Sequence, residues 1–408
     1  MFAHRPQWSI CLRICNRQTG HCSVAAPIEN KNVVYMKIVV KEVSNPKEFK
    51  IFYQFQNKLY ANCKEYVPTL DMDQKNTLRN DPALDYCKRV MLLAYKGDRV
   101  VGRIMGMINP RYNDFYGKKN VRFGWFDFEN DIEIARALLN EVIEWGRAAG
   151  MDHIHGPLAF NTLGRQGMLV EGFENTPPVN CLYNFKYYPE IMARLGFEKE
   201  CDWVQYKINA SQGIPDKIVR IAQMIMQRHN LRVLDIGKLS KSEIRNLTTK
   251  FFDAYNECFK AVTNFIPLTD KEREITGKHY FSMLTPSLTG VVVDEENDIA
   301  AFGISIPSLS EAFKKAKGKL FPFGWYYILK AYKHYKDIDL MLVGSSPKWA
   351  SKGISAIYHA NLASHYREQN LRWAYTNPQI ETNTAALKVW ESYSKEPFMR
   401  RRCWIKEI

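Results

Sequence analysis

The spacing of apolar residues changes repeatedly along this chain of 408 residues, and each spacing predicts one kind of secondary structure. Apolar and polar residues alternate from Met36 to Val43, which is the pattern of a strand with one buried face. Residues 131–149 instead place apolar side chains three and four positions apart, which is the pattern of an amphipathic helix. Gly150 follows this helix and favours its termination, because glycine readily adopts the left-handed conformation that ends helices.

The same order of predicted elements occurs twice. In the first half we expect a helix, a strand pair, a strand, a helix and two strands, at residues 46–66, 89–95, 98–108, 121–128, 131–149, 153–158 and 197–208. In the second half the strands fall at residues 231–236, 289–294, 299–306, 338–343, 372–376 and 398–405, with helices between them. The recurrence indicates an internal duplication. Mixed strand pairs and strand-helix-strand units favour α/β or α+β layers over bundles and sandwiches.

The amino-terminal segment, residues 1–35, differs from the rest of the chain. It shows no sustained strand or helix period and no apolar stretch long enough for a signal peptide. We expect it to be a disordered leader, or a stretch included because the start of the gene was assigned upstream of Met36. After it, a connector near residues 209–215 separates an N-terminal domain, residues 36–209, from a C-terminal domain, residues 215–408.

The segment from Leu340 to Ser355 is the most informative part of the sequence. An apolar strand ends there in a loop of small residues that leads into a helix, so backbone N–H groups and the positive end of the helix dipole converge. Lys348 and Lys352 add positive charge, and Gly353 lets a ligand approach the main chain. The pattern favours an anion such as a diphosphate, although an ordinary strand-to-helix turn has the same pattern.

Together with residues 381–393, this segment resembles the GNAT acyltransferase superfamily, in which a strand, loop and helix hold the pyrophosphate of coenzyme A. The family loop has the form R/Q-x-x-G-x-G/A, and the corresponding positions here are Ala350, Gly353 and Ser355. The first side chain, which donates to phosphate in the family, is therefore absent, while the loop amides are retained. Asn383 matches the asparagine that contacts the pantetheine arm.

The resemblance implies both a fold and a set of site residues. The fold would be α/β (α+β), with two tandem GNAT-like domains, each a mixed, mostly antiparallel sheet flanked by helices. Acetyl-CoA or another acyl-CoA would be the cosubstrate, entering a V-shaped gap between the strands at Val343 and Tyr375. The cofactor-binding residues would be Leu342, Val343, Gly344, Lys348, Ala350, Ser351, Lys352, Gly353, Ile354, Ser355 and Asn383.

The sequence defines the catalytic groups less well. The tyrosine that protonates the leaving thiolate in the family falls at Trp390, and indole cannot act as that acid. Tyr393, one helical turn further on, is the substitute that we expect to be catalytic. The attacking amine must also lose a proton, for which Glu381, His279 and Glu171 are candidate bases. The sequence places none of these three near the thioester.

The first half lacks the corresponding anion site. Its strand-to-helix junction, residues 126–133, carries four carboxylates, which suit a helix N-terminus but repel a phosphate. We therefore expect the N-terminal domain to have no coenzyme A loop and to shape the acceptor site. Its motifs, among them Gly156-Pro157 and Tyr187-Tyr188-Pro189, resemble an uncharacterised bacterial group of two-GNAT proteins. The C-terminal half is the clearer match to the superfamily.

The charge of the chain narrows the range of partners. Lys and Arg number 57 against 43 Asp and Glu, a formal net charge of +14, which is compatible with nucleic acid, an anionic membrane or a polyphosphate cofactor. Much of the excess lies in one lysine- and tyrosine-rich segment, residues 311–336, so the charge does not require a nucleic-acid partner. Such a segment also suits an anionic membrane or an acidic carrier protein.

The sequence lacks the motifs that mark hydrolases, NTPases and dehydrogenases, which disfavours these functional classes. The sequence has no apolar stretch long enough to cross a bilayer, and no Walker loop, dinucleotide motif, nucleophile elbow or zinc-ligand spacing. His153 and His155 share one side of a strand, but without a recognisable third ligand we expect no metal. Irregular cysteine spacing favours reduced thiols and a cytoplasmic location. Nothing in the sequence indicates the oligomeric state.

We therefore expect an acyl-CoA-dependent transferase, with acetyl-CoA as the simplest donor, that acylates a small-molecule or peptide amine by direct attack on the thioester. One alternative is a catalytically silent binding protein that keeps the GNAT fold. A second is an aminoacyl or peptidoglycan-precursor transferase, whose donor would be charged tRNA and whose basic surface would contact it.

Overall fold

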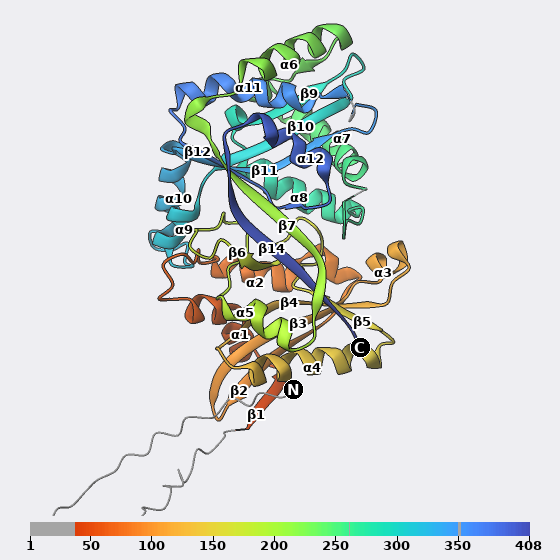
Figure 1. Cartoon of the computed structure of the whole chain (residues 1–408), viewed down its shortest axis with the longest axis vertical. Coiled ribbons are helices and arrows are strands. Elements are labelled where there is room, and N and C mark those ends of the chain that lie inside the picture. The colour runs from red at the N-terminus through yellow and green to blue at the C-terminus, as the bar shows by residue number, and fades with distance from the viewer. Residues whose placement is uncertain (1–36, 261, 350–351) are drawn as a thin grey trace, which may run out of the picture. The chain divides into compact units, whose positions relative to one another are not determined.

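The computed structural model describes residues 37–408 except 261, 350 and 351, so the expected leader, residues 1–35, lies outside the described residues. Residues 38–408 form one unit that combines helices with a fourteen-stranded sheet. Most strand pairs in this sheet are antiparallel (Figure 1). The expected α/β class with a mixed, mostly antiparallel sheet is confirmed.

Strands and helices alternate along both halves. The strands are β1 (Ile38–Glu42), β2 (Lys88–Lys96), β3 (Arg99–Ile108), β4 (Asn120–Phe128), β5 (His153–Gly156), β6 (Met168–Glu171), β7 (Glu198–Asn209), β8 (Arg232–Val233), β9 (Thr289–Val293), β10 (Ile299–Pro307), β11 (Asp337–Ser345), β12 (Trp373–Thr376), β13 (Gln379–Ile380) and β14 (Lys395–Glu407). The helices are α1 (Pro46–Leu59), α2 (Asp71–Asn80), α3 (Pro110–Tyr116), α4 (Ile132–Ala148), α5 (Tyr187–Arg194), α6 (Asp216–His229), α7 (Lys241–Phe259), α8 (Asp270–Met283), α9 (Ser310–Ala316), α10 (Gly324–Lys333), α11 (Ser355–Glu368) and α12 (Thr384–Lys388).

The elements expected from periodicity are present, and the main difference is a helix at the start of the second half. The strand expected at residues 231–236 is reduced to the two residues of β8, and α6 precedes it. Pro215, expected in a connector, lies directly before α6, where proline suits the start of a helix. None of the described helices is long and apolar enough to span a bilayer.

The two halves exchange their last strands. The sheet order is β1-β2-β3-β4-β5-β14-β7-β12-β11-β10-β9-β8. The strand beside β5 is therefore β14 from the end of the chain, and the strand beside β12 is β7 from the first half. β7 and β14 pair with each other along most of their length at the middle of the sheet (Figure 1). The boundary at residues 209–215 stays a prediction, since one sheet joins both halves.

Asp202 is the central polar group of this exchange. Its carboxylate, on β7, is 1% exposed and accepts two hydrogen bonds from Arg402 of β14, at 2.8 and 2.9 Å. Its carbonyl oxygen accepts a hydrogen bond from the N–H of Glu381. Burial raises the pKa of Asp202, but the hydrogen bonds and charge of Arg402 outweigh burial and hold that pKa below its usual value. The pair thus links strands from both halves in a desolvated setting.

Removing this carboxylate should destabilise the whole unit. Asp202→Ala removes the partner of the Arg402 guanidinium, which is itself 27% exposed, and we expect the free energy of unfolding to fall by about 1 to 3 kcal/mol in urea denaturation at pH 7. The matched control is Asp253→Ala, which breaks an exposed ion pair with Arg273 and should cost less than about 1 kcal/mol. Because the folded-state pKa of Asp202 is lowered, its contribution is present above pH 4 and lost on further acidification. Equal losses in both variants would contradict this role.

Candidate functional site

β11 and β12 separate close to where the resemblance implies a gap. Their pairing runs from Asp337 with Trp373 to Leu340 with Thr376, where β12 ends. β11 continues to Ser345, and a bulge places the extra residue Met341 in it opposite β10. A bulge re-aims the side chains that follow it. The gap therefore opens just beyond Tyr375 and next to Val343.

A cavity of about 180 Å³ fills this gap. Residues 340–343 of β11 line one side and residues 377–380 line the other. Of the residues expected to bind the cofactor, Leu342, Val343 and Asn383 lie in its lining, together with Ala386. Asn383 also caps α12, since its Oδ1 accepts a hydrogen bond from the N–H of Ala386 at 3.1 Å. The cap fixes one wall of the gap.

The loop after the gap leads to an open helix end. α11 begins at Ser355, and no side chain caps its N-terminus. Gly353 has a φ of +68°, and a Cβ there would meet only the side chain of Ile225, at 3.7 Å. Ile354 is buried beneath the loop. Two of the expected cofactor residues, Ala350 and Ser351, lie outside the described residues.

Two further expected cofactor residues, Gly344 and Lys348, have structural partners. A Cβ on Gly344 would lie 2.5 Å from the Phe302 ring, so packing alone requires glycine there. The Nζ of Lys348 lies 3.1 Å from a carboxylate oxygen of Asp294. Lys352, in contrast, is exposed, and its Nζ lies 4.3 Å from the centre of the Trp349 ring. Lys352 is thus the more available cation of the loop.

Tyr393, expected to be catalytic, lies away from the gap. It is 9% exposed, burial raises the pKa of its hydroxyl, and its ring contacts those of His359 and Trp390. It is absent from the described lining of the three cavities, so its catalytic role stays a prediction. Trp390 does line the gap, with its indole N–H donating to Gln379. Tyr255 of α7 lines it too, a placement that the pattern of its own helix could not reveal.

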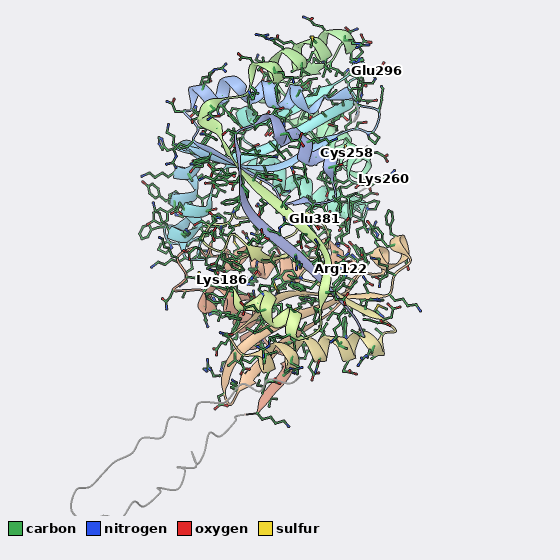
Figure 2. The ribbon with its side chains drawn as sticks, in the orientation of Figure 1. Arg122, Lys186, Cys258, Lys260, Glu296 and Glu381 are labelled. Carbon is green, nitrogen blue, oxygen red and sulfur yellow. The ribbon has the colours of Figure 1, made fainter. Side chains whose placement is uncertain are left out.

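The candidate bases named from the sequence have other partners. Glu381 forms ion pairs with Lys199 and Arg400 beside the β7–β14 pair (Figure 2). Glu171 is 69% exposed and also pairs with Arg400, at 3.3 Å. The side chain of His279 lies outside the described residues. Neither carboxylate is directed to the gap.

Asp339 is the acidic group that the sequence reasoning missed. It lies in β11, four residues before Val343 and on the other side of the bulge, and is 2% exposed. Neither carboxylate oxygen makes a hydrogen bond of good geometry. Burial raises its pKa to about 7, opposed by the Ser308 hydroxyl and assisted by the charge of Asp337. The signal was present, since an acidic residue interrupts an otherwise apolar strand.

Asp339 lines a second cavity of about 580 Å³. Tyr375 of β12 lies in the same lining, as do Tyr327 and Lys330 of α10 and His334 directly after that helix. A buried carboxyl that titrates near neutral pH is typical of a group that exchanges protons with a ligand. This cavity is therefore the second part of the candidate site.

The first half has an equivalent gap. β4 and β5 stay paired only as far as Arg122 with His155, and β4 carries a bulge near Trp125, whose φ is +45°. The space beyond is a cavity of about 340 Å³. Leu163 and Met341 line both this cavity and the one between β11 and β12. The first half therefore adds room directly beside the second gap.

Acidic side chains occupy the first-half junction, as expected. Asp127 forms a buried ion pair with Arg103 at 2.7 Å, on the wall of the 340 Å³ cavity. Asp131 caps α4 and pairs with Lys96. The absence of a coenzyme A loop from this half stays a prediction that these contacts favour.

One cluster in the described part of the chain has metal-ligating side chains. His155, Glu200 and Cys403 come from β5, β7 and β14, and one oxygen of Glu200 lies 3.1 Å from the Nδ1 of His155 and 3.0 Å from the sulfur of Cys403. Burial raises the pKa of Glu200, but His155, Cys403 and Lys118 lower it to about 2. The buried guanidinium of Arg122 adds further positive charge (Figure 2). Cations on this side disfavour a metal ion.

Comparison with known proteins supports the likeness in fold. No family model matches the chain. It is 25% identical over 398 residues to the bacterial ceramide synthase of Caulobacter vibrioides, covering 94% of this chain and 100% of that protein. It is 23% identical over 389 residues to Protein YghO of Escherichia coli, covering 93% and 98%. A solved tandem GNAT protein from the clavulanic acid biosynthesis pathway matches with a TM-score of 0.52 at 11% identity, over 91% of this chain and 98% of that one.

The raised pKa of Asp339 has a measurable effect on stability. The folded state keeps the proton up to about pH 7, whereas an unfolded aspartate loses it near pH 4. This group therefore lowers the stability of the fold as the pH rises from 4 to 7. Asp339→Asn should raise the free energy of unfolding at pH 8 by roughly 1 to 4 kcal/mol and change it little at pH 4. Asp253→Asn, which removes an exposed carboxylate paired with Arg273, should give no gain at pH 8, and an equal gain there would refute the assignment to Asp339.

Proposed function

The chain has the tandem GNAT fold, and from that premise we propose that it is an acyl-CoA-dependent N-acyltransferase whose second half holds the cosubstrate. The observation that best supports this proposal is the gap between β11 and β12, whose cavity of about 180 Å³ is lined by Val343 and Asn383. In this proposal the pyrophosphate binds at the N-terminus of α11, which no side chain caps, near Gly353 and Lys352, where the helix dipole and a cation favour an anion. The pantetheine arm runs from there past Asn383 into the gap.

The thioester carbonyl needs a hydrogen-bond donor as negative charge develops on its oxygen. Pairing with β12 stops at Leu340, so a β11 backbone N–H that faces the gap has lost its neighbouring strand. Such a group around Val343 is free to donate to the oxyanion. The amine nitrogen attacks the carbonyl carbon, the carbon–sulfur bond breaks, and the products are an amide and free coenzyme A. A thiolate leaves more readily than an amine because its conjugate acid has a pKa near 8.5.

Asp339 is the base that we propose for the acceptor amine. An amine with a pKa of about 10 is mostly protonated at neutral pH and must lose a proton before or during attack. The pKa of Asp339, about 7, suits a group that accepts this proton and returns it to solvent. Asp339 lines the 580 Å³ cavity, which offers the acceptor room beside β11. A tyrosine donor for the thiolate is less critical, and Tyr255 and Tyr393 remain alternatives for that step.

A long-chain amine is the acceptor class that we favour. The relative named as a bacterial ceramide synthase matches over its whole length, and a ceramide is the N-acyl derivative of a long-chain amino alcohol. The 340 Å³ cavity supports this choice, since it adjoins the gap at Leu163 and Met341 and is also lined by Phe160, Leu309 and Phe313. A hydrocarbon chain of the acyl donor or the acceptor fits such walls. Acetyl-CoA stays the smallest donor to be tested.

A catalytically silent binding protein is the second candidate. Ala350 cannot donate to phosphate, the indole N–H of Trp390 is taken by Gln379, and Tyr393 lies away from the gap. This protein would bind coenzyme A thioesters without releasing free coenzyme A.

Binding of the cosubstrate tests both candidates. Gly353→Trp fills the space at the start of α11, and we expect calorimetric titration with acetyl-CoA and palmitoyl-CoA to show at least a tenfold loss of affinity. The matched control is Gly117→Trp, at another open position with a φ of +61°, because it carries the same backbone strain. If the parent protein bound no coenzyme A species, both candidates would fall.

Turnover separates the enzyme from the silent protein. With palmitoyl-CoA and a long-chain amino alcohol, release of free coenzyme A should increase as the pH rises through about 7, because Asp339 accepts protons only when ionised. Asp339→Asn should lower kcat by about 10²- to 10⁴-fold and remove this pH step, while Asp337→Asn should keep a step but move it to lower pH, because the charge of Asp337 helps to raise the pKa of Asp339. Coenzyme A binding without turnover at any pH would favour the silent protein.

A further inference from the structure

The surface of α10 and the loop before it carries an unusual group of exposed apolar side chains, which we call the α10 patch. Five of the ten large apolar side chains that are exposed in the described part of the chain lie within nine residues: Phe321 (71% exposed), Phe323 (66%), Trp325 (45%), Tyr326 (49%) and Leu329 (54%). Large apolar groups gathered in this way mark an interaction surface rather than random exposure.

Positive charge surrounds the patch. Residues 315–336 contain six lysines and no Asp or Glu. All six lysines are exposed, and none of them forms an ion pair with a described residue: Lys315, Lys317, Lys319, Lys330, Lys333 and Lys336. On α10, the positions of Trp325, Leu329 and Lys333 follow one another at intervals of four, so apolar and basic groups share one helix face. This surface complements a partner that is both apolar and anionic.

The opposite side of α10 meets the candidate site. Ile328 and Ala331 pack against Leu309 and Phe313, which also line the 340 Å³ cavity. Tyr327, Lys330 and His334 line the 580 Å³ cavity that contains Asp339. One helix thus separates the exposed patch from both cavities.

We propose that the α10 patch docks the protein on the surface of an anionic lipid bilayer. Aromatic side chains flanked by lysines are typical of segments that insert into the interface while their charges contact lipid headgroups. The details favour a bilayer over a single-stranded nucleic acid. Leu329 offers no stacking face, and the Trp325 and Tyr326 rings meet edge to face at 6.2 Å, so they form no parallel platform for bases. The indole N–H of Trp325 already donates to the carbonyl of Pro322.

Docking in this orientation sets the cavities beside the lipid. A long-chain amine dissolved in the bilayer would reach Asp339 by passing α10, without crossing water with its chain exposed. The proposal goes beyond the acyl transfer inferred above and does not depend on it, since vesicle binding requires neither a donor nor turnover.

Sedimentation with vesicles of phosphatidylcholine containing 25% phosphatidylglycerol, compared with phosphatidylcholine alone, is the direct test. We expect the full chain to bind the anionic vesicles at least tenfold more tightly at about 0.1 M salt. Phe323→Ser with Leu329→Ser, and separately Lys319→Glu with Lys333→Glu, should each weaken this binding at least tenfold. These side chains are exposed, so circular dichroism and the melting temperature should remain those of the parent.

Two matched controls locate the effect. Phe115→Ser with Met224→Ser replaces apolar side chains of similar exposure outside the patch, at 51% and 60%, and Lys47→Glu with Lys50→Glu reverses two exposed charges on α1. Each control should bind anionic vesicles within twofold of the parent. Failure of the parent to bind them, or equal losses in the controls, would overturn the proposal. If only the charge-reversal variant lost vesicle binding, and a single-stranded oligonucleotide bound through the patch, the partner would be nucleic acid and not a bilayer.

Discussion

The pairing of β7 with β14 is the interaction on which the rest of the structure depends. Each is the last strand of one half, and each lies in the sheet of the other half. The far wall of the β11–β12 gap is fixed to this pair, because β12 and β13 both pair with β7. The near wall is fixed to β10 through β11. The gap therefore lies between two anchored walls, one of which is supplied by the other half of the chain.

Both halves have the same kind of opening, but the charges beside the two openings differ. β4 with β5 and β11 with β12 are parallel pairs that part after a few residues, beside a bulge in the longer strand. In the first half, carboxylates and a buried Arg103–Asp127 pair occupy the end of that strand. In the second half, small residues and Lys352 follow it. An anion such as a diphosphate is disfavoured beside the first arrangement and favoured beside the second.

Local patterns in the sequence were enough to predict most of the elements, though not α6, and could not predict their long-range pairing. Apolar runs located β4 and β11, and helical spacing located α4 and α11, because these patterns lie within each element's own residues. They could not reveal the strand exchange, since β14 has the same pattern beside β5 as beside β12. Asp202, Tyr255 and the His155–Glu200–Cys403 cluster remained hidden for the same reason, as their partners come from distant segments. Asp339 was visible as a charge within an apolar strand, but only its burial identified it as a titrating group.

The exchanged strands also bear on how the two-half chain arose and on how it folds. A single half would leave the parallel edge of its sheet uncovered, and an unpaired edge invites association. Two copies of one half could cover these edges by lending each other a last strand, which is the arrangement of a domain-swapped dimer. Joined into one chain, the swap becomes intramolecular. The first half then cannot complete its sheet until β14 has been synthesised, so the two halves finish folding together.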